Sequence, residues 1–399
     1  MKSILRGNTR ADIYNANVRS GVCANTSRQV VNRCSREDQQ IGEINAHKEN
    51  SSSISSRTVT TLYEVADEGV SSSPSSVHPA AWGLGAVATL GASVYGLTKS
   101  FESGSRPYTG NVGQEYDAWT EEGILEHYWG EHIHLGYYSD KERSAGYVWK
   151  DFKKAKYDFI DEMLKFSTCS QPTSILDVGC GFGGTSRHLA NMFPKASVRG
   201  ITLSPKQVQR GTELAKERGL NNVEFKVMDA LKMEYEDNSF DLVWACESGE
   251  HMPDKKKYVD EMVRVLKPGG VLVIACWCQR EETPEKPLTE QEKKELKFLY
   301  DEWAHPYFIS IEEFERLTKG TGVMEAVATA DWTPETIPSW HHSIVDGATH
   351  PWLVMSKPHI WYKTARDVWC ILRMHDAFDK GLMQYGMITG RKVVATSPA

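Results

Sequence analysis

A glycine-rich turn stands between an apolar segment and a segment with helical character, and such a turn can hold a nucleotide-like cofactor. Its ten residues are Ile175, Leu176, Asp177, Val178, Gly179, Cys180, Gly181, Phe182, Gly183 and Gly184. Glycine lets the backbone approach a ligand closely where a Cβ would clash, and a helix over 185–193 would offer backbone N–H donors at its start. Asp177 ends the apolar segment, where it can fix the turn or meet an ammonium group. We therefore predict a cofactor site at this turn.

The spacing of the glycines leaves the identity of the cofactor open. Gly179, Gly181 and Gly184 fit the G-x-G-x-x-G pattern of a dinucleotide site, which also needs an acidic residue about 20 positions further on. The next apolar segment ends with Thr202 and Leu203, neither of which is acidic. A nicotinamide cofactor is compatible with the glycines, but its usual ribose ligand is missing.

Three titratable residues follow another apolar run and could act as a general base. Glu247, Glu250 and His251 come directly after the segment 240–245. The carboxyl ends of strands in an open α/β sheet face the ligand crevice, so these side chains are candidates for taking a proton from a substrate. Two structural interpretations compete. Glu247 could hold a backbone N–H or cap a turn, and His251 could be a hydrogen-bonded histidine at a helix start.

His132 and His134 are further candidates on the segment that precedes the sheet. Their spacing places both on one face if that segment is a strand. Two histidines on one face could begin a metal site, but no third ligand has suitable spacing. We therefore predict no metal, and we expect these histidines to line the substrate site.

The glycine turn lies in a region where strand-like and helix-like segments alternate. Strands are predicted over 174–178, 197–202, 223–227, 240–245 and 271–277, and helices over 206–218 and 255–266. Ser204 and Pro205 suit the N-cap and first position of a helix, and Gly219 suits its end. This alternation predicts an α/β fold with a parallel sheet.

The order of these segments resembles the class I S-adenosylmethionine-dependent methyltransferases. The glycine turn resembles their first motif, Asp229-Ala230 follows the third strand, Phe240-Asp241-Leu242-Val243 begins the fourth, and Leu266-Lys267-Pro268-Gly269-Gly270 precedes the fifth. The resemblance implies a Rossmann-like seven-strand sheet with helices on both faces and S-adenosylmethionine as cofactor. It implies that the ten turn residues, Thr202, Leu203, Asp229 and Ala230 bind that cofactor. Asp229 would lie near the adenine amine, and Thr202 implies that hydroxyl and backbone groups contact the ribose.

A closer resemblance, over roughly 112–393, is to the tocopherol C-methyltransferases. It is carried by residues 128–138, 200–205, 244–255 and 388–392, with Asp331 and Trp332. That family methylates gamma-tocopherol or its precursor methyl-phytyl-benzoquinol, and the resemblance does not choose between them. It implies a lipid-like phenolic acceptor lined by Trp129, His132, His134 and Trp332. The alternatives are a sterol C-methyltransferase, a small-amine N-methyltransferase, and a non-catalytic lipid-binding protein on the same scaffold.

The segment from about 280 to 385 interrupts the alternation of strand-like and helix-like segments, and we expect it to form a helical, aromatic cap. A charged, solvated helix is predicted over 280–302. Five tryptophans then crowd 38 positions, at 332, 340, 352, 361 and 369. They could line an apolar tunnel for a prenyl tail, or they could be the core of the cap, and one cap can do both.

The first 110 residues differ in composition from the rest. Residues 1–36 carry a net charge of +6 in a chain whose total is −7, with Ser, Thr and Asn between the arginines. This pattern predicts a transit peptide over 1–50, for a plastid if the family resemblance holds. A polar linker is expected over 51–110, containing the uncharged run 80–97, which is at the lower length limit for a membrane span. This run could be a membrane anchor, the hydrophobic part of a second targeting signal, or a weak tail helix. We expect a membrane surface as partner, with the methyltransferase domain over 111–393.

Overall composition excludes several classes of protein. The chain has 399 residues, 40% of them hydrophobic and 25% charged, which excludes a wholly disordered chain. Its acidic balance argues against a nucleic-acid partner, and the sequence carries no sign of a protein partner. The eight cysteines form neither a disulfide scaffold nor a zinc ribbon.

Overall fold

The computed structural model describes Gly113, Asp117, Thr120 and residues 123–303, 305–358 and 361–394. The chain divides into the units Met1–Gly83 and Leu84–Ala399, and all described residues belong to the second. The predicted transit peptide, the linker and the run 80–97 lie outside the described residues. The boundaries expected for the domain and its cap stay predictions.

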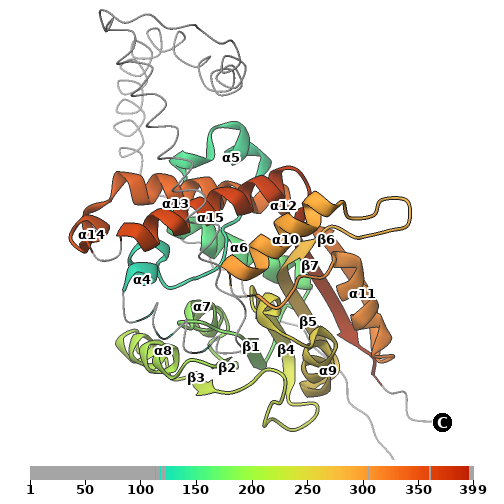
Figure 1. Cartoon of the computed structure of the whole chain (residues 1–399). Helices are drawn as coiled ribbons and strands as arrows, with labels where there is room; N and C mark the ends of the chain where they lie inside the picture. The colour runs from blue at the N-terminus through green and yellow to red at the C-terminus, as the bar shows by residue number, and fades with distance from the viewer. Residues whose placement is uncertain are drawn as a thin grey trace, which may run out of the picture. The chain divides into compact units, whose positions relative to one another are not determined.

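A seven-stranded sheet in the order β3-β2-β1-β4-β5-β7-β6 forms the centre of the second unit (Figure 1). The strands are β1 Ser174–Val178, β2 Ser197–Thr202, β3 Val223–Val227, β4 Phe240–Cys246, β5 Leu266–Gln279, β6 Met324–Asp331 and β7 Met383–Lys392. The first five pair in parallel, whereas β7 is antiparallel to both β5 and β6. The five predicted strands are confirmed. β6 and β7 complete the seven-stranded sheet that the family resemblance implies, at positions that the sequence patterns did not give.

Helices cover both faces of this sheet, as predicted. Their bounds are α4 Ile124–Trp129, α5 Asp140–Ser144, η3 Tyr147–Trp149, α6 Phe152–Ser167, α7 Gly184–Met192, α8 Pro205–Glu217, η4 Gly249–His251, α9 Lys255–Val265, α10 Glu290–Glu302, α11 Ile311–Gly320, α12 Thr333–Thr336, α13 Pro338–Thr349, α14 Trp352–Met355 and α15 Trp361–Asp379. Alternate residues of β4 and β5 enter two separate cores, since successive strand side chains point to opposite faces. Leu242 and Val273 join α6 and α15 in one core, whereas Val243 and Ile274 join α9 and α11 in the other.

Local sequence signals explain where the helices begin and end. Ser204 accepts a hydrogen bond of 3.1 Å from the Gln207 N–H and caps α8, and Gly219 adopts a left-handed φ of +67° just after that helix. The helix predicted over 280–302 is shorter than expected. It begins at Glu290, because Thr289 and Glu292 form a capping box there.

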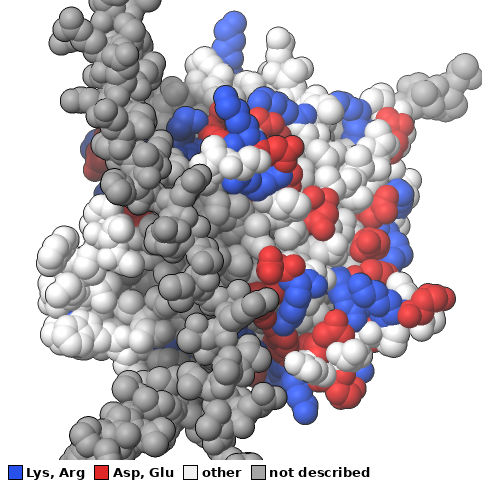
Figure 2. Space-filling view, turned by 90° about the horizontal axis from the view of Figure 1, so that it is seen from above, with Lys and Arg blue, Asp and Glu red and all other residues white. Residues whose placement is uncertain are grey.

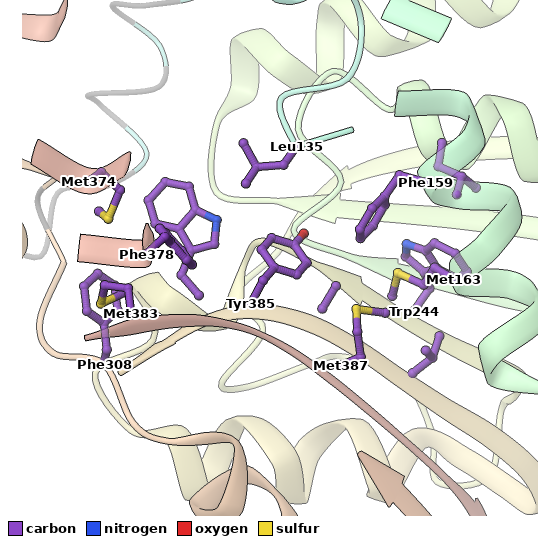
Figure 3. Close-up of a cluster of buried hydrophobic side chains, with 14 of the residues drawn as sticks. Leu135, Phe159, Met163, Trp244, Phe308, Met374, Phe378, Met383, Tyr385 and Met387 are labelled. Carbon is purple, nitrogen blue, oxygen red and sulfur yellow. The ribbon is translucent and has the colours of Figure 1, made fainter. Parts of the chain in front are cut away.

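The cap consists mainly of α10 and α12–α15, which lie over one end of the sheet in Figure 1. Figure 3 shows how it joins the sheet: Met374 and Phe378 from α15 lie beside Met383 and Tyr385 from β7. Phe159 of α6 meets the Tyr385 ring edge-on, with centroids 5.6 Å apart. This buried cluster fixes the cap to the strand that carries Tyr385.

The five cap tryptophans do not form a single cluster. Trp340 is buried in the core against Trp277 and Phe378. Trp352 and Trp361 are 72% and 53% exposed. Trp352 and Trp361 therefore do not belong to a buried cap core, and the apolar tunnel for a prenyl tail stays a prediction. Among the described residues, no helix is long and apolar enough to cross a bilayer.

Candidate active site

A cavity of about 300 Å³ opens where the carboxyl ends of β1, β2 and β4 meet. This is the point where the strand order reverses, the usual ligand position in open α/β sheets. Of the residues expected to bind cofactor or substrate, those that line it are His132, His134, Asp177, Gly179, Cys180, Gly181, Thr202, Leu203, Asp229, Ala230, Glu247 and His251. Segments far apart in sequence thus converge on one cavity.

The glycine turn borders the cavity at two positions that would not tolerate a larger side chain. At Gly181 the φ is +53°, and a Cβ would point into space whose nearest atom is Ile133 Cδ1 at 3.6 Å. At Gly179 a Cβ would clash with Ser248 at 2.3 Å. Gly181 therefore keeps the cavity open, whereas Gly179 allows the turn to pack against the segment after β4.

Asp177 holds the turn to the helix that follows it. Its Oδ2 accepts a hydrogen bond of 2.6 Å from the Ser186 hydroxyl in α7. Burial raises the pKa of Asp177 to about 6, and the hydrogen bonds from Ser186 partly offset this. Asp177 is also one of the residues that line the cavity.

Gln207 is a site residue that sequence reasoning missed. It lies in the first turn of α8, it is buried, and it lines the cavity beside Thr202. The Thr202 hydroxyl donates a hydrogen bond of 2.7 Å to Gln207 Oε1, while Gln207 Nε2 has no hydrogen-bond partner among the described residues. A buried amide donor is costly to leave unpaired, so this corner fits a ligand with an oxygen acceptor. The sequence did offer one signal for this residue: Gln207 is the third residue after Ser204, the N-cap of α8, and so lies in the first turn of that helix.

Asp229 follows β3 and lies near the end of β2, because the N–H of the preceding Met228 donates a hydrogen bond of 3.0 Å to the Thr202 carbonyl oxygen. The Asp229 side chain is exposed and lines the cavity, and Oδ1 accepts a hydrogen bond of 2.8 Å from the Leu231 N–H. Ala230 and the half-exposed Leu203 supply apolar surface nearby. This region combines an acceptor with apolar walls.

His132 and His134 line the cavity together, with ring centroids 5.3 Å apart. Their segment does not pair as a strand. The Nδ1 of His134 is 2.8 Å from the Leu135 carbonyl oxygen, whereas neither ring nitrogen of His132 has a partner among the described residues. Burial lowers the pKa of His134 to about 3 and that of His132 well below its ordinary value. Both are therefore neutral near pH 7.

Glu247 is the most unusual side chain in the site. It adopts a left-handed φ of +49°, which is strained for a residue with a Cβ. Its Oε1 accepts hydrogen bonds from the Leu135 N–H at 2.8 Å and the Tyr385 hydroxyl at 2.7 Å. Burial, followed by the charge of Glu250, raises the pKa of Glu247 to about 8, and its hydrogen bonds partly oppose this. A carboxyl with this pKa can accept a proton near neutral pH.

Glu250 and His251 follow Glu247 in the short helix η4, and of these two only His251 lines the cavity. Glu250 is buried, does not line the cavity and accepts a hydrogen bond from the Trp277 N–H. Burial raises its pKa to about 7. His251 lines the cavity and lies against the His305 ring at 4.4 Å, and burial lowers its pKa to about 3. Glu247 is thus the carboxylate of this group that faces the cavity.

A group of buried polar atoms continues from His305 into the cap. Trp277, Trp303 and Trp340 contact one another at 5.1–5.8 Å between ring centroids, and Trp277 also contacts His305. Their three indole nitrogens and the His305 Nδ1 have no hydrogen-bond partner among the described residues. The Trp277 backbone N–H bonds Glu250, so this group adjoins the carboxyl residues that follow β4.

The remaining predicted site residues lie outside the cavity lining. Ile175, Leu176, Val178 and Phe182 are buried, and Gly183 and Gly184 face Phe225 and Glu131. Trp129 packs edge-on against Phe152, and Trp332 packs against Phe159, Phe166 and Tyr137. Within the described part of the chain, no three metal-ligating residues form a group.

Several known proteins are similar to this chain in sequence. The methyltransferase-domain family matches residues 170–351. A 2-methyl-6-phytyl-1,4-hydroquinone methyltransferase of Synechocystis sp. is 44% identical over 292 residues, 72% of this chain and 89% of the relative. A probable chloroplastic tocopherol O-methyltransferase of Oryza sativa is 38% identical over 69% of this chain and 76% of its own. Norajmaline N-methyltransferase of Rauvolfia serpentina is 34% identical over 70% and 97%.

Solved structures share the fold at lower identity. The [4+2]-cyclase SpnF is 24% identical with a TM-score of 0.58, over 73% of this chain and all but 1% of its own. A geranyl diphosphate methyltransferase in complex with GPP and sinefungin is 20% identical with a TM-score of 0.57, over 72% of this chain and its own full length. These likenesses confirm the seven-stranded sheet with helices on both faces.

Proposed function

This chain belongs to the family of S-adenosylmethionine-dependent methyltransferases that includes the tocopherol-pathway enzymes, and from this premise we propose that it methylates a ring carbon of a prenylated phenol or hydroquinone. The proposed acceptors are gamma-tocopherol and methyl-phytyl-benzoquinol in tocopherol biosynthesis. The Synechocystis relative is named for the hydroquinone, and the Oryza relative for tocopherol. The observation that carries the proposal is the Glu247 carboxyl, held by two hydrogen bonds at the edge of the cavity.

The residues around the cavity fit S-adenosylmethionine. Gly181 leaves open the space that a side chain would fill, and Gln207 offers a buried, unpaired donor among the described residues. We assign Thr202 and Gln207 to the ribose hydroxyls, and Asp229 to the adenine amine. When bound, the cofactor supplies an already activated methyl group. The chain must therefore bind it, align the acceptor and accept a proton, and alignment alone can supply about 7–11 kcal/mol.

Glu247 is the proposed general base. A phenol ring carbon is far more nucleophilic once the hydroxyl loses its proton, and Glu247 takes that proton. The ring carbon releases its own proton after it gains the methyl group, and the oxygen regains a proton as the phenol forms again. Two protons are thus removed and one is returned, so each turnover releases one net proton. Tyr385 and Leu135 hold Oε1, which leaves Oε2 unengaged by these two donors. A base placed in this way contributes roughly 10²–10⁴-fold in rate.

A direct assay tests the proposal. The purified protein is incubated with methyl-labelled S-adenosylmethionine and, separately, with methyl-phytyl-benzoquinol, gamma-tocopherol, a sterol and a secondary amine. The position of the label in the product is read by mass spectrometry and NMR. We expect label on a ring carbon of a prenylated acceptor. Label on oxygen or nitrogen, or cofactor binding without turnover of any acceptor, would contradict C-methylation.

We further propose that the protein acts in a plastid at a membrane. Support comes from the arginine-rich N-terminus and from relatives of Oryza sativa and Arabidopsis thaliana that are named chloroplastic. A fluorescent fusion of residues 1–110 should enter plastids. A fusion that stays in the cytosol would contradict the localisation without affecting the proposed reaction.

A second candidate is methylation of an amine nitrogen. One observation favours it: the norajmaline N-methyltransferase is 34% identical over 97% of its own length. An amine must be neutral to attack, so a carboxyl base beside it would serve the same step. The acceptor panel separates the two candidates, because an N-methyltransferase would leave the prenylated phenols unlabelled.

A further inference from the structure

One stretch of the cap carries almost no charge. Residues 337–362 hold two charged side chains, Asp346 and Lys357, in a chain of which 25% is charged. The stretch contains all of α13 and α14 and the start of α15. A solvated surface helix normally carries charged residues on its outer face. The composition therefore indicates that part of this stretch meets something other than water.

The structure shows which side chains are exposed there. Trp352 and Met355 of α14 are 72% and 54% exposed, and Trp361 and Tyr362 at the start of α15 are each 53% exposed. The Trp361 indole N–H donates a hydrogen bond of 2.9 Å to the Val354 carbonyl oxygen, which joins the two helices. We call Trp352, Met355, Trp361 and Tyr362 the α14 patch. Figure 2 shows few charged side chains on the left side of the molecule, where α14 lies in Figure 1.

We propose that the α14 patch inserts into the interface of a lipid bilayer. Tryptophan and tyrosine prefer this zone because each combines a large apolar ring with a single polar group. Residues 347–362 contain no acidic side chain, so anionic lipid would not repel the patch. The choice of a bilayer over another apolar partner rests on the proposed function, since a prenylated acceptor is dissolved in lipid.

The cap connects the α14 patch to the cavity. The Ser339 hydroxyl of α13 accepts a hydrogen bond of 2.7 Å from the Gly136 N–H, and the Tyr138 hydroxyl lies 2.8 Å from His342 Nδ1. Near the end of α13, the His350 carbonyl oxygen accepts a bond of 2.8 Å from the Tyr128 hydroxyl. These bonds hold the segment 128–138, which carries His132 and His134 into the cavity lining. Docking at α14 therefore brings one wall of the cavity close to the lipid surface.

The test compares full-length protein and variants on lipid vesicles that contain no acceptor. The patch variant combines Trp352→Ser, Met355→Ser and Trp361→Ser, and the control is Val227→Ser, an exposed apolar residue of β3. Vesicles of phosphatidylcholine and a galactolipid are used, and bound protein is separated by flotation. We expect the patch variant to partition at least about tenfold more weakly, with the control unchanged. Tryptophan emission of the wild type should be quenched by brominated lipid, and less so in Trp352→Phe.

Two results would overturn this inference. One is equal vesicle binding by the wild type and the patch variant, which would assign binding to another part of the chain. The other is a wild type that self-associates through the patch, with the variant monomeric and vesicle binding unchanged. Methylation of a short-tailed, water-soluble acceptor is measured in parallel. Failure of that reaction in the wild type would count against the proposed function. Normal turnover by the wild type, together with equal vesicle binding by the wild type and the patch variant, would count only against membrane insertion of the α14 patch.

Discussion

The Tyr385 hydroxyl, on the antiparallel strand β7, donates a hydrogen bond of 2.7 Å to Oε1 of Glu247, which follows the parallel strand β4. The two residues are 138 positions apart in sequence. The bond joins the strand that secures the cap to the residue that we propose as the base. Tyr385 is thus a positioning residue, and its effect should appear in the pH dependence of the reaction.

Tyr385→Phe removes this donor while keeping the ring in the buried cluster of Figure 3. The hydrogen bond lowers the pKa of Glu247, so its loss should move the alkaline rise of kcat/KM to higher pH, by roughly one unit if the bond contributes about 1.5 kcal/mol. The pH profile of kcat/KM is the measurement. Reduced activity with an unshifted profile would indicate a purely structural role for Tyr385.

Glu247→Gln should lower kcat by roughly 10²–10⁴-fold and leave cofactor affinity nearly unchanged, because the amide cannot take the proton. In the wild type, activity should rise with pH through about 8, the pKa of Glu247. Glu250→Gln is the matched comparison, since Glu250 does not line the cavity. A larger loss in Glu250→Gln than in Glu247→Gln would transfer the proposed role to Glu250.

Glu247 also predicts how stability depends on pH. Burial favours its neutral form in the folded state and raises its pKa from 4.5 to about 8. The wild type should therefore lose stability as pH rises across that range. Glu247→Gln lacks this loss, so its Tm relative to the wild type should increase from about pH 5 to about pH 9. A difference in Tm that is constant over this range would contradict the raised pKa.

Sequence patterns predicted the glycine turn and the five parallel strands because both depend on local signals. The partner of Glu247 could not be predicted in this way. Tyr385 reaches it only because β7 inserts between β5 and β6, a long-range pairing that no local pattern records. The spacing of the tryptophans in the sequence also does not show that Trp340 is buried and Trp352 is exposed. That difference depends on how α13 and α14 pack on their neighbours.

Gly181→Val should abolish cofactor binding while the protein stays folded. The substituted side chain would enter the cavity, and the φ of +53° is unfavourable for a β-branched residue. Gly320→Ala is the control, since no atom lies near its Cβ position and its φ is ordinary. Isothermal titration with S-adenosylmethionine measures the effect. If the affinity of the variant stays within about threefold of the wild type, roughly 0.7 kcal/mol, the glycine turn is not part of the cofactor site.

Gln207→Leu tests the residue that sequence patterns did not identify. Its Nε2 is the donor that is buried and unpaired among the described residues, and leucine keeps the volume while removing both polar groups. Loss of a hydrogen bond to a neutral ribose hydroxyl should weaken S-adenosylmethionine binding by roughly fivefold to tenfold, about 1–1.5 kcal/mol. Gln209→Leu is the matched control, because Gln209 lies on the same helix, is exposed and bonds Glu213 instead. The two variants should have similar Tm values, so that affinity separates them. If both bind the cofactor as tightly as the wild type, the unpaired amide belongs to a buried water or to the protein's own packing, and Thr202 alone would remain as the side-chain contact to the ribose.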